Sequence, residues 1–169
     1  MSTISAGTSK TAPVQAGGTS PPELEGRFSV YVDGAARGNP GDAGVGAYLF
    51  GPSGEHKAHG SKYIGAKSNN VAEYEALSFG LWLAKQHGVR KLFVLMDSEL
   101  VVKQVAGEYQ TKAPHLKPLK DKVQRQMKWF AACELCHIPR EKNREADRLA
   151  NQAIDKVTGR RRPKRTEEA

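Results

Sequence analysis

The sequence predicts an α/β fold, a five-stranded mixed sheet flanked by helices, with elements in the order β-β-β-α-β-α-α-β-α. Short runs rich in β-branched and aromatic residues alternate with longer segments of helical periodicity. One run, residues 91–96, is apolar almost throughout, which is typical of a strand buried on both faces. The length of 169 residues suits one domain with a core of its own.

Periodicity, turn residues and caps place the individual elements. The β-rich runs predict strands over residues 28–32, 45–50, 57–64, 91–96 and 133–138. Helical periodicity with capping residues, among them Asn143, predicts helices over residues 69–87, 99–106, 114–130 and 144–157. The cluster of small and polar residues over 35–42 is interpreted as a turn between the first two strands.

Composition divides the chain into three parts. Residues 1–26, mostly Ser, Thr, Ala, Gly and Pro, carry a net charge of −1 and are expected to be disordered. Residues 27–158 form the predicted folded domain, with a net charge of +6. Residues 159–169 carry +3 and predict a basic tail.

Charge and composition also limit the class of protein. The net charge of +8 favours a polyanionic partner, nucleic acid first, with a solubilising surface charge as the alternative. No apolar run approaches the roughly 18 residues of a membrane span, and no signal peptide is visible. Two cysteines cannot build a disulfide scaffold, so we expect a reducing, cytoplasmic location in a prokaryote. Organelle import through residues 1–26 is the alternative.

Two further predictions concern packing. Cys133 and Cys136 lie three residues apart in one strand and therefore face opposite sides of the sheet, so we expect buried thiols rather than a disulfide or a zinc site. Trp82 and Trp129 occupy apolar positions of predicted helices, and we expect both in the core.

Four carboxylates stand out by their positions. Asp33 ends the first strand and Asp97 ends the buried strand, whereas Glu73 lies in the first turn of the long helix and Asp147 one turn into the last helix. If the two strands are parallel neighbours, Asp33 and Asp97 emerge side by side at the carboxyl ends, where open α/β sheets place their sites. Four clustered acids favour hard divalent cations such as Mg²⁺ or Mn²⁺.

Each acid also has a purely structural interpretation. Asp97 fits a helix N-cap, Glu73 and Asp147 fit helix starts favoured by the helix dipole, and Asp33 fits a turn. The joint occurrence of all four on separate elements favours the metal site.

The ordered motifs around these acids resemble the type 1 ribonucleases H, in the short archaeal-type form. The resemblance spans residues 27–158 and implies a ribonuclease H-like catalytic domain. It rests on Tyr31-Val32-Asp33-Gly34 with Gly38-Asn39-Pro40-Gly41, Ser68-Asn69-Asn70-Val71-Ala72-Glu73, Asp97-Ser98, and His137-Ile138-Pro139-Arg140-Glu141-Lys142-Asn143-Arg144-Glu145-Ala146-Asp147.

The resemblance implies an endonuclease that hydrolyses the RNA strand of RNA–DNA hybrids and leaves 5′-phosphate and 3′-hydroxyl ends. Asp33, Glu73, Asp97 and Asp147 would hold two Mg²⁺ ions, or Mn²⁺ in their place, with Asp33 bridging both. One ion would activate the attacking water and the other would stabilise the leaving 3′-oxygen. The scissile phosphate would supply further metal ligands. The implied partner is the hybrid, and we expect a monomer.

The resemblance also implies substrate contacts. Asn39 and the glycines around it match positions that touch RNA 2′-hydroxyls, Asn69 and Asn70 match contacts to the hybrid, and Ser68 matches a residue that grips a DNA phosphate. Turn formation by Asn39 and helix capping by Ser68 or Asn69 are the alternatives. The full predicted set is Gly34, Gly38, Asn39, Gly41, Ser68, Asn69 and Asn70.

The chain departs from the best-known bacterial members in two binding features. Between Asp97 and Asp147 it lacks the extra helix and basic handle of those members. Residues 103–128 nevertheless carry a net charge of +5, interpreted as a reduced DNA-strand-binding face or as a solvated helix surface. Glu99 stands where a substrate-contacting Gln would be usual.

A third departure concerns assistance to catalysis. Many members carry a mobile His in a Gly-rich loop ten residues before the last Asp, and His137 has that spacing but precedes Ile138 and Pro139. Archaeal-type members have an Arg at the position of Arg140, which can organise phosphate oxygens. Both His137 and Arg140 are candidates, and we favour Arg140.

Two other functions are compatible with this fold, a non-catalytic hybrid-binding module and a nuclease that acts on DNA. The presence of all four acids argues against the first. Asn39, Asn69 and Asn70 favour an RNA–DNA hybrid over DNA.

Overall fold

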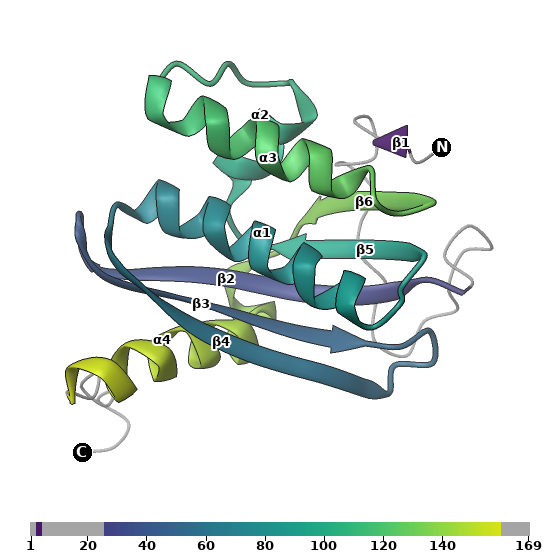
Figure 1. Ribbon diagram of the computed structural model, residues 1–169, viewed down its shortest axis with the longest axis horizontal. Helices are drawn as coiled ribbons and strands as arrows, with labels where there is room; N and C mark the ends of the chain where they lie inside the picture. Colours follow the sequence, from purple (N-terminus) through teal and green to yellow (C-terminus); the bar gives the residue numbers. More distant parts are fainter. Residues whose placement is uncertain (1–2, 5–25, 160–169) are drawn as a thin grey trace.

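The computed structural model describes residues 3–4 and 26–159 (Figure 1). Within these residues one sheet has the strand order β1-β6-β5-β2-β3-β4. The strands are β1 (Thr3–Ile4), β2 (Phe28–Gly38), β3 (Gly41–Phe50), β4 (His56–Lys67), β5 (Lys91–Met96) and β6 (Ala132–His137). The helices are α1 (Asn69–Gln86), α2 (Glu99–Ala106), α3 (Lys117–Met127) and α4 (Arg144–Thr158), with 3-10 turns η3 (Pro114–Leu116) and η4 (Arg140–Lys142).

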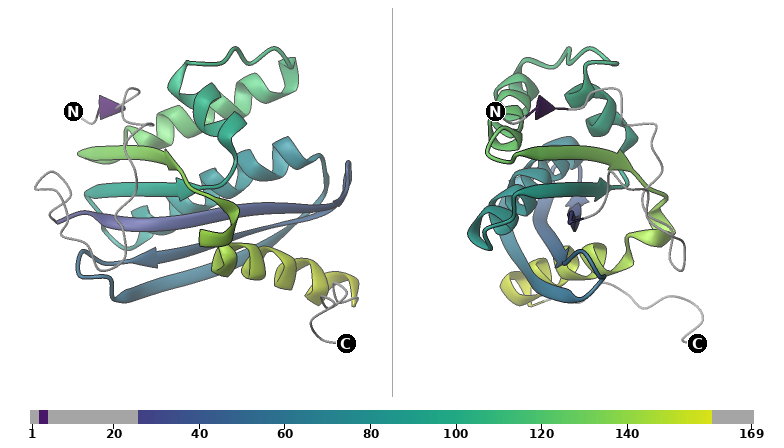
Figure 2. Two further views of the ribbon diagram at one scale, coloured as in Figure 1. Left: turned by 180° about the vertical axis from the view of Figure 1, so that it is seen from behind. Right: turned by 90° about the vertical axis from the view of Figure 1, so that its right-hand side faces the viewer.

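The sheet is mixed, and β2 lies at its centre. β2, β3 and β4 are antiparallel neighbours, whereas β5 pairs in parallel with β2, β6 with β5 and β1 with β6. Helix α1, with α2 and α3 beside it, lies on one face of the sheet, and α4 crosses the other face (Figures 1 and 2). This arrangement confirms the predicted ribonuclease H-like α/β architecture and its order of elements.

A hydrophobic core lies on each side of the sheet. The larger one joins the sheet to the three-helix side and includes Val30, Val32, Leu77 and Leu81. The smaller one, on the side of α4, consists of Phe93, Leu95, Cys136 and Ile138 with Tyr31 packed against it. The alternation of β5 residues between the two cores agrees with the prediction of a strand buried on both faces.

The cysteine prediction is confirmed. Cys133 lies in the larger core and Cys136 in the smaller one, so the two thiols face opposite sides of the sheet. Both are buried and free of disulfide bonds, and burial raises the pKa of each thiol.

The short strand β1 differs from the expectation for residues 1–26. Thr3 and Ile4 pair in parallel with Ala132 and Cys133. Without β1, strand β6 would end the sheet with unpaired backbone groups, which readily accept a further strand. The remainder of the predicted disordered segment, residues 5–25, and the basic run 160–165 lie outside the described residues.

The first hairpin is longer than predicted. β2 and β3 stay paired as far as Gly38 and Gly41, so most of segment 35–42 is strand rather than turn. The glycines of this hairpin serve a close contact with α4 on the sheet face, because a side chain at Gly46 would overlap the backbone of Ala146. Small residues here therefore indicate helix–sheet packing as well as a turn.

The predicted helix over residues 114–130 is shorter than expected. It begins at Lys117, one residue before Pro118, because proline fits the first turn of an α-helix. The preceding residues form η3 instead, and α3 ends at Met127.

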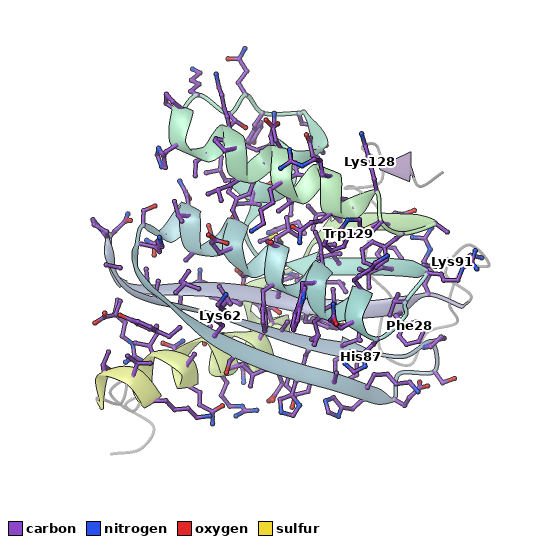
Figure 3. The ribbon with its side chains drawn as sticks, viewed as in Figure 1. Phe28, Lys62, His87, Lys91, Lys128 and Trp129 are labelled. Carbon is purple, nitrogen blue, oxygen red and sulfur yellow. The ribbon has the colours of Figure 1, made fainter. Side chains whose placement is uncertain are left out.

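The prediction that both tryptophans are buried is wrong. Trp82 is 47% exposed and Trp129 is 44% exposed. Trp82 lies on the same helix face as the half-buried Glu75 and Phe79, beside the buried stripe that contains Leu77, Leu81 and Ala84. The two tryptophans, with Lys62 and Arg125, line an open groove of about 650 Å³ between α1, α3 and β4 (Figure 3).

The described residues contain no helix long and apolar enough to cross a membrane.

Candidate active site

Two of the predicted acids lie at neighbouring parallel strands. The β2–β5 pairing runs as far as Tyr31 and Leu95, and Asp33 and Asp97 each follow two residues later. Side chains two residues apart in a strand share a face, so both carboxylates emerge at the same end of the sheet. Asp33 is buried at 8% exposure, which makes it the innermost acid of the site.

Glu73 reaches this edge from α1. It is the fifth residue of the helix and therefore lies in the second turn, which corrects the prediction of the first turn. Gly34 brings the two elements together, because a side chain there would overlap the backbone of Ala72. Ser98 Oγ, which also caps α2, donates a 3.1 Å hydrogen bond to Glu73 Oε1.

Asp147 approaches from the opposite face of the sheet on α4. It lies in the first turn of that helix, as predicted, and it contributes to the electrostatic field at Asp33. Asn151, one turn further along, donates a 3.2 Å hydrogen bond to Asp147 Oδ1. The four acids thus converge from two strands and from helices on both faces of the sheet.

The electrostatics of this cluster are unfavourable to four negative charges. Burial, followed by the charges of Asp97, Asp147 and Glu73, raises the pKa of Asp33 to about 9. Burial also raises the pKa of Glu73, and the nearby charge of Arg140 opposes that rise. A divalent cation beside Asp33 would reverse the balance in favour of the ionised form.

Carboxylate oxygens are the ligands that Mg²⁺ and Mn²⁺ prefer, so the donor set fits these ions. No three His, Cys, Asp or Glu side chains of the described chain are grouped closely enough to hold a metal by themselves. Mg²⁺ is commonly bound by one or two carboxylates, several waters and substrate phosphate oxygens.

Asn143 has a part in the site that the sequence did not suggest. It was predicted as the side-chain cap of α4, but it makes no capping hydrogen bond. Instead its side-chain nitrogen donates to Val32 O at 2.8 Å and to Asp97 Oδ2 at 3.3 Å. A buried amide satisfies its donors wherever acceptors lie, and here the acceptors come from β2 and from the residue after β5. Asn143 therefore ties α4 to both acid-bearing strands.

The predicted RNA-contacting residues lie at the tip of the β2–β3 hairpin. Asn39 is exposed, and its Oδ1 accepts a 3.0 Å hydrogen bond from the backbone N–H of Asn69. This contact brings the hairpin turn to the start of α1. Because Oδ1 is occupied, the amide nitrogen of Asn39 is the group left to face a substrate. Gly38 has a φ of +109°, a conformation that favours glycine, and Gly41 lies next to it across the hairpin.

The start of α1 holds the other predicted contacts. Ser68 is the N-cap, and its Oγ accepts a 3.3 Å hydrogen bond from Val71 N. The alternative interpretation of Ser68 as a helix cap is thus correct, and a phosphate contact by the same residue stays a prediction. Asn69 is exposed and Asn70 half-buried, so both side chains can meet a ligand at this end of the helix.

The end of β6 and the residues after it contain the two candidates for assisting catalysis, His137 and Arg140, and the surroundings of these two residues differ. His137 is the exposed last residue of β6, in register with Met96. Ile138, buried at 1% exposure, anchors the chain directly after it. Arg140 begins η4, is exposed, and lies near enough to Glu73 for its charge to oppose the rise in the pKa of that carboxyl. Of these two residues, Arg140 is the one with a described electrostatic interaction with the acid cluster, through Glu73.

Comparisons with known proteins agree with the site. Residues 31–153 match a protein family described as reverse transcriptase-like. Ribonuclease HI of Halobacterium salinarum is 40% identical over 134 residues, which cover 79% of this chain and 67% of that protein. The chain belongs to the ribonuclease HI family. The crystal structure of the Halobacterium RNase H1 superimposes with a TM-score of 0.76, over 78% of this chain and 99% of that one.

Two further RNase H relatives are similar. The structure of LC11-RNase H1 in complex with RNA/DNA hybrid is 42% identical and has a TM-score of 0.74, over 78% of this chain and 99% of that one. A bifunctional protein of Mycobacterium tuberculosis is 41% identical over 129 residues, but the chain spans only 35% of its length. The N-terminal RNase H domain of that protein has a TM-score of 0.75 and covers 80% of this chain.

The raised pKa of Asp33 predicts a stability effect in this RNase H when metal is removed. The folded protein keeps this proton up to about pH 9, whereas an unperturbed Asp releases it near pH 3.8, so Asp33 lowers stability progressively as the pH rises between these values. In EDTA, Asp33→Asn should therefore melt above the wild type at pH 8, and the difference should shrink toward pH 4. Thermal unfolding followed by circular dichroism tests this expectation. Asp121→Asn, at an exposed position on α3, is the control, and a pH-independent difference for Asp33→Asn would contradict it.

Proposed function

We propose that this protein is an endonuclease that hydrolyses the RNA strand of RNA–DNA hybrids and leaves 5′-phosphate and 3′-hydroxyl ends. The observation that carries the proposal is the convergence of Asp33, Glu73, Asp97 and Asp147 from four elements, in a chain of the ribonuclease HI family. The LC11 relative that binds an RNA/DNA hybrid supports the choice of substrate.

Asp33, Glu73, Asp97 and Asp147 are the residues that would hold divalent metal, Mg²⁺ or Mn²⁺. When bound, the pair of ions supplies an activated water and stabilises the leaving 3′-oxygen. Asp33 contributes from the rigid centre of the sheet, so its position is set by β2. Ser98 orients Glu73, and Asn143 orients Asp97, through the hydrogen bonds described above. These contacts hold the carboxylates in place before substrate arrives.

Recognition of RNA is assigned to the hairpin tip and the start of α1. Asn39 offers an amide nitrogen, which can donate to a ribose 2′-hydroxyl, and Asn69 and Asn70 lie beside it. Backbone groups at Gly34, Gly38 and Gly41 belong to the same strand pair. Ser68 at the start of α1 would contact a phosphate of the DNA strand, because a helix N-terminus favours anions.

Cleavage should require metal and should be confined to the RNA strand of a hybrid. The test is incubation with labelled hybrid, duplex DNA and duplex RNA, each with Mg²⁺, Mn²⁺ or EDTA. Asp97→Asn should lower turnover by several orders of magnitude because it removes a metal ligand, whereas Asp121→Asn should cleave like the wild type.

Three results would contradict this function. Cleavage of duplex DNA at a comparable rate would indicate a DNA nuclease, and binding of hybrid without cleavage would indicate a non-catalytic module. Near-normal turnover of Asp97→Asn would show that the four carboxylates do not form the active site.

Arg140 is assigned as the residue that holds the scissile phosphate, in preference to His137. Pro139 fixes φ and cannot donate, and η4 adds the hydrogen bond from Asn143 N to Arg140 O, so this segment is stiffer than a Gly-rich loop. Arg140→Ala should lower kcat by roughly 10- to 1000-fold, the range for loss of one charge-stabilising donor, and Arg140→Lys should retain part of the activity.

His137→Ala is the matched comparison and should lower kcat much less. Single-turnover rates on the hybrid, measured beside melting temperatures, separate catalysis from stability. The reverse ranking, a large loss for His137→Ala and none for Arg140→Ala, would assign the supporting role to the histidine.

A further inference from the structure

Asp147 is connected to the β2–β3 hairpin by a chain of side-chain contacts. Arg37, on β2, directs its Nη2 toward Asn151 Oδ1 at 3.1 Å and toward Asp155 Oδ1 at 2.7 Å. Asn151 in turn donates from Nδ2 to Asp147 Oδ1 at 3.2 Å and to Asp147 O at 3.0 Å. The contacts therefore run from Arg37 through Asn151 to the carboxylate.

The orientation of the Asn151 amide follows from the chemistry of its neighbours. A guanidinium has donors only, so the group of Asn151 that faces Arg37 must be the carbonyl oxygen. The amide nitrogen of Asn151 must then point the other way, toward Asp147. Arg37 also donates to the backbone oxygen of Asn151 at 3.3 Å, which fixes the guanidinium against α4. Arg37 and Asp147 thus favour the same orientation of the Asn151 amide from its two ends.

This hydrogen bond limits the freedom of the Asp147 side chain. A carboxylate at the solvent edge of a helix can rotate about its last torsion, because that torsion has a broad energy profile. A donor at Oδ1 favours one orientation of the Asp147 carboxylate. Asn151 is 6% exposed, so solvent competes little for its donors.

Packing alone does not account for an asparagine at this place. Position 151 lies on the buried stripe of α4 with Leu149, Ala150, Ala153 and Ile154, where an apolar side chain would be ordinary. Asn is a weaker helix former than Leu or Ala, and its buried amide has to be hydrogen-bonded. The polar residue is explained by the two groups that it joins.

We propose that Arg37 and Asn151 form a positioning pair that orients Asp147 for metal binding and couples it to the hairpin that ends in Asn39. The inference rests on the proposed function, because it assigns Asp147 to the metal site. Arg37 lies two residues before Asn39. The residue that supports the Asp147 carboxylate therefore also supports the RNA-contacting turn. Neither Arg37 nor Asn151 touches the substrate in this scheme.

The test uses Asn151→Leu, which keeps the branched shape of the side chain and removes its three hydrogen bonds, and Arg37→Met, which removes the donor at the carbonyl end of the amide. Asn151→Leu should lower kcat by about 10- to 100-fold, the usual cost of losing a residue that orients a metal ligand, with the KM for hybrid unchanged. Its Mg²⁺ concentration for half-maximal rate should rise. Arg37→Met should show the same changes in smaller degree. Gln152→Ala, an exposed neighbour on α4, should match the wild type.

Two measurements distinguish positioning from a merely structural role. Calorimetric titration of Mn²⁺ into the substrate-free protein should show weaker binding to Asn151→Leu than to Gln152→Ala. The double variant Arg37→Met/Asn151→Leu should have the same kcat and Mg²⁺ dependence as Asn151→Leu, because the arginine orients Asp147 through the amide. Losses that multiply in the double variant, or lower melting temperatures with unchanged metal dependence, would overturn the proposal.

Asp147→Asn separates this inference from the proposed function. If Asp147→Asn is inactive while Asn151→Leu and Arg37→Met behave as the wild type, the positioning pair is refuted and the active site stands. If Asp147→Asn retains full activity, the assignment of Asp147 to the metal site fails, and the positioning pair fails with it.

Discussion

Four carboxylates meet at one end of the sheet, and the scaffold has to hold them there against their mutual repulsion. Asp33 is the most affected, since it is buried and has three acidic neighbours. The acids cannot move apart, because each belongs to a different element that is fixed by its own packing. Gly34 allows α1 to approach β2, and Gly46 allows α4 to approach β3, so the backbones on both faces come closer than side chains would permit. The free energy of the folded core therefore offsets the repulsion, and a bound cation would relieve it.

Neutral amides carry much of this support. Asn143 joins α4 to β2 and to Asp97, Asn151 orients Asp147, and Asn39 joins the hairpin to α1. An amide can hold a carboxylate through a hydrogen bond without supplying a positive charge that would compete with a metal ion. Arg37 is consistent with this division, because its guanidinium donates to Asn151 and Asn151 in turn donates to Asp147. The cluster thus stays negative while its geometry is fixed.

The sequence was sufficient to predict the fold and that the four acids lie together, because both depend on local and repeating features. The apolar run of β5 and the position of Asp97 directly after it locate one half of the site, and the motif around Asp33 locates the other. The contacts of Asn143 could not be predicted in the same way. An Asn before a helix is favoured as a cap by local preference, whereas its acceptors here come from residues 111 and 46 positions away in the chain.

Two other differences have a comparable origin. The Gly- and Ala-rich segment after Asp33 has turn composition, but the packing of α4 on the sheet lets it continue as strand. Trp82 was assigned to the core because its helix is apolar on several sides, and only the tertiary arrangement shows which side faces the sheet. Local patterns determine which elements form, whereas contacts between distant segments determine which side chains serve the site. A supporting asparagine such as Asn151 has no recognisable sequence pattern. Its role can be inferred only from its two neighbours in the fold, Asp147 on one side and Arg37 on the other.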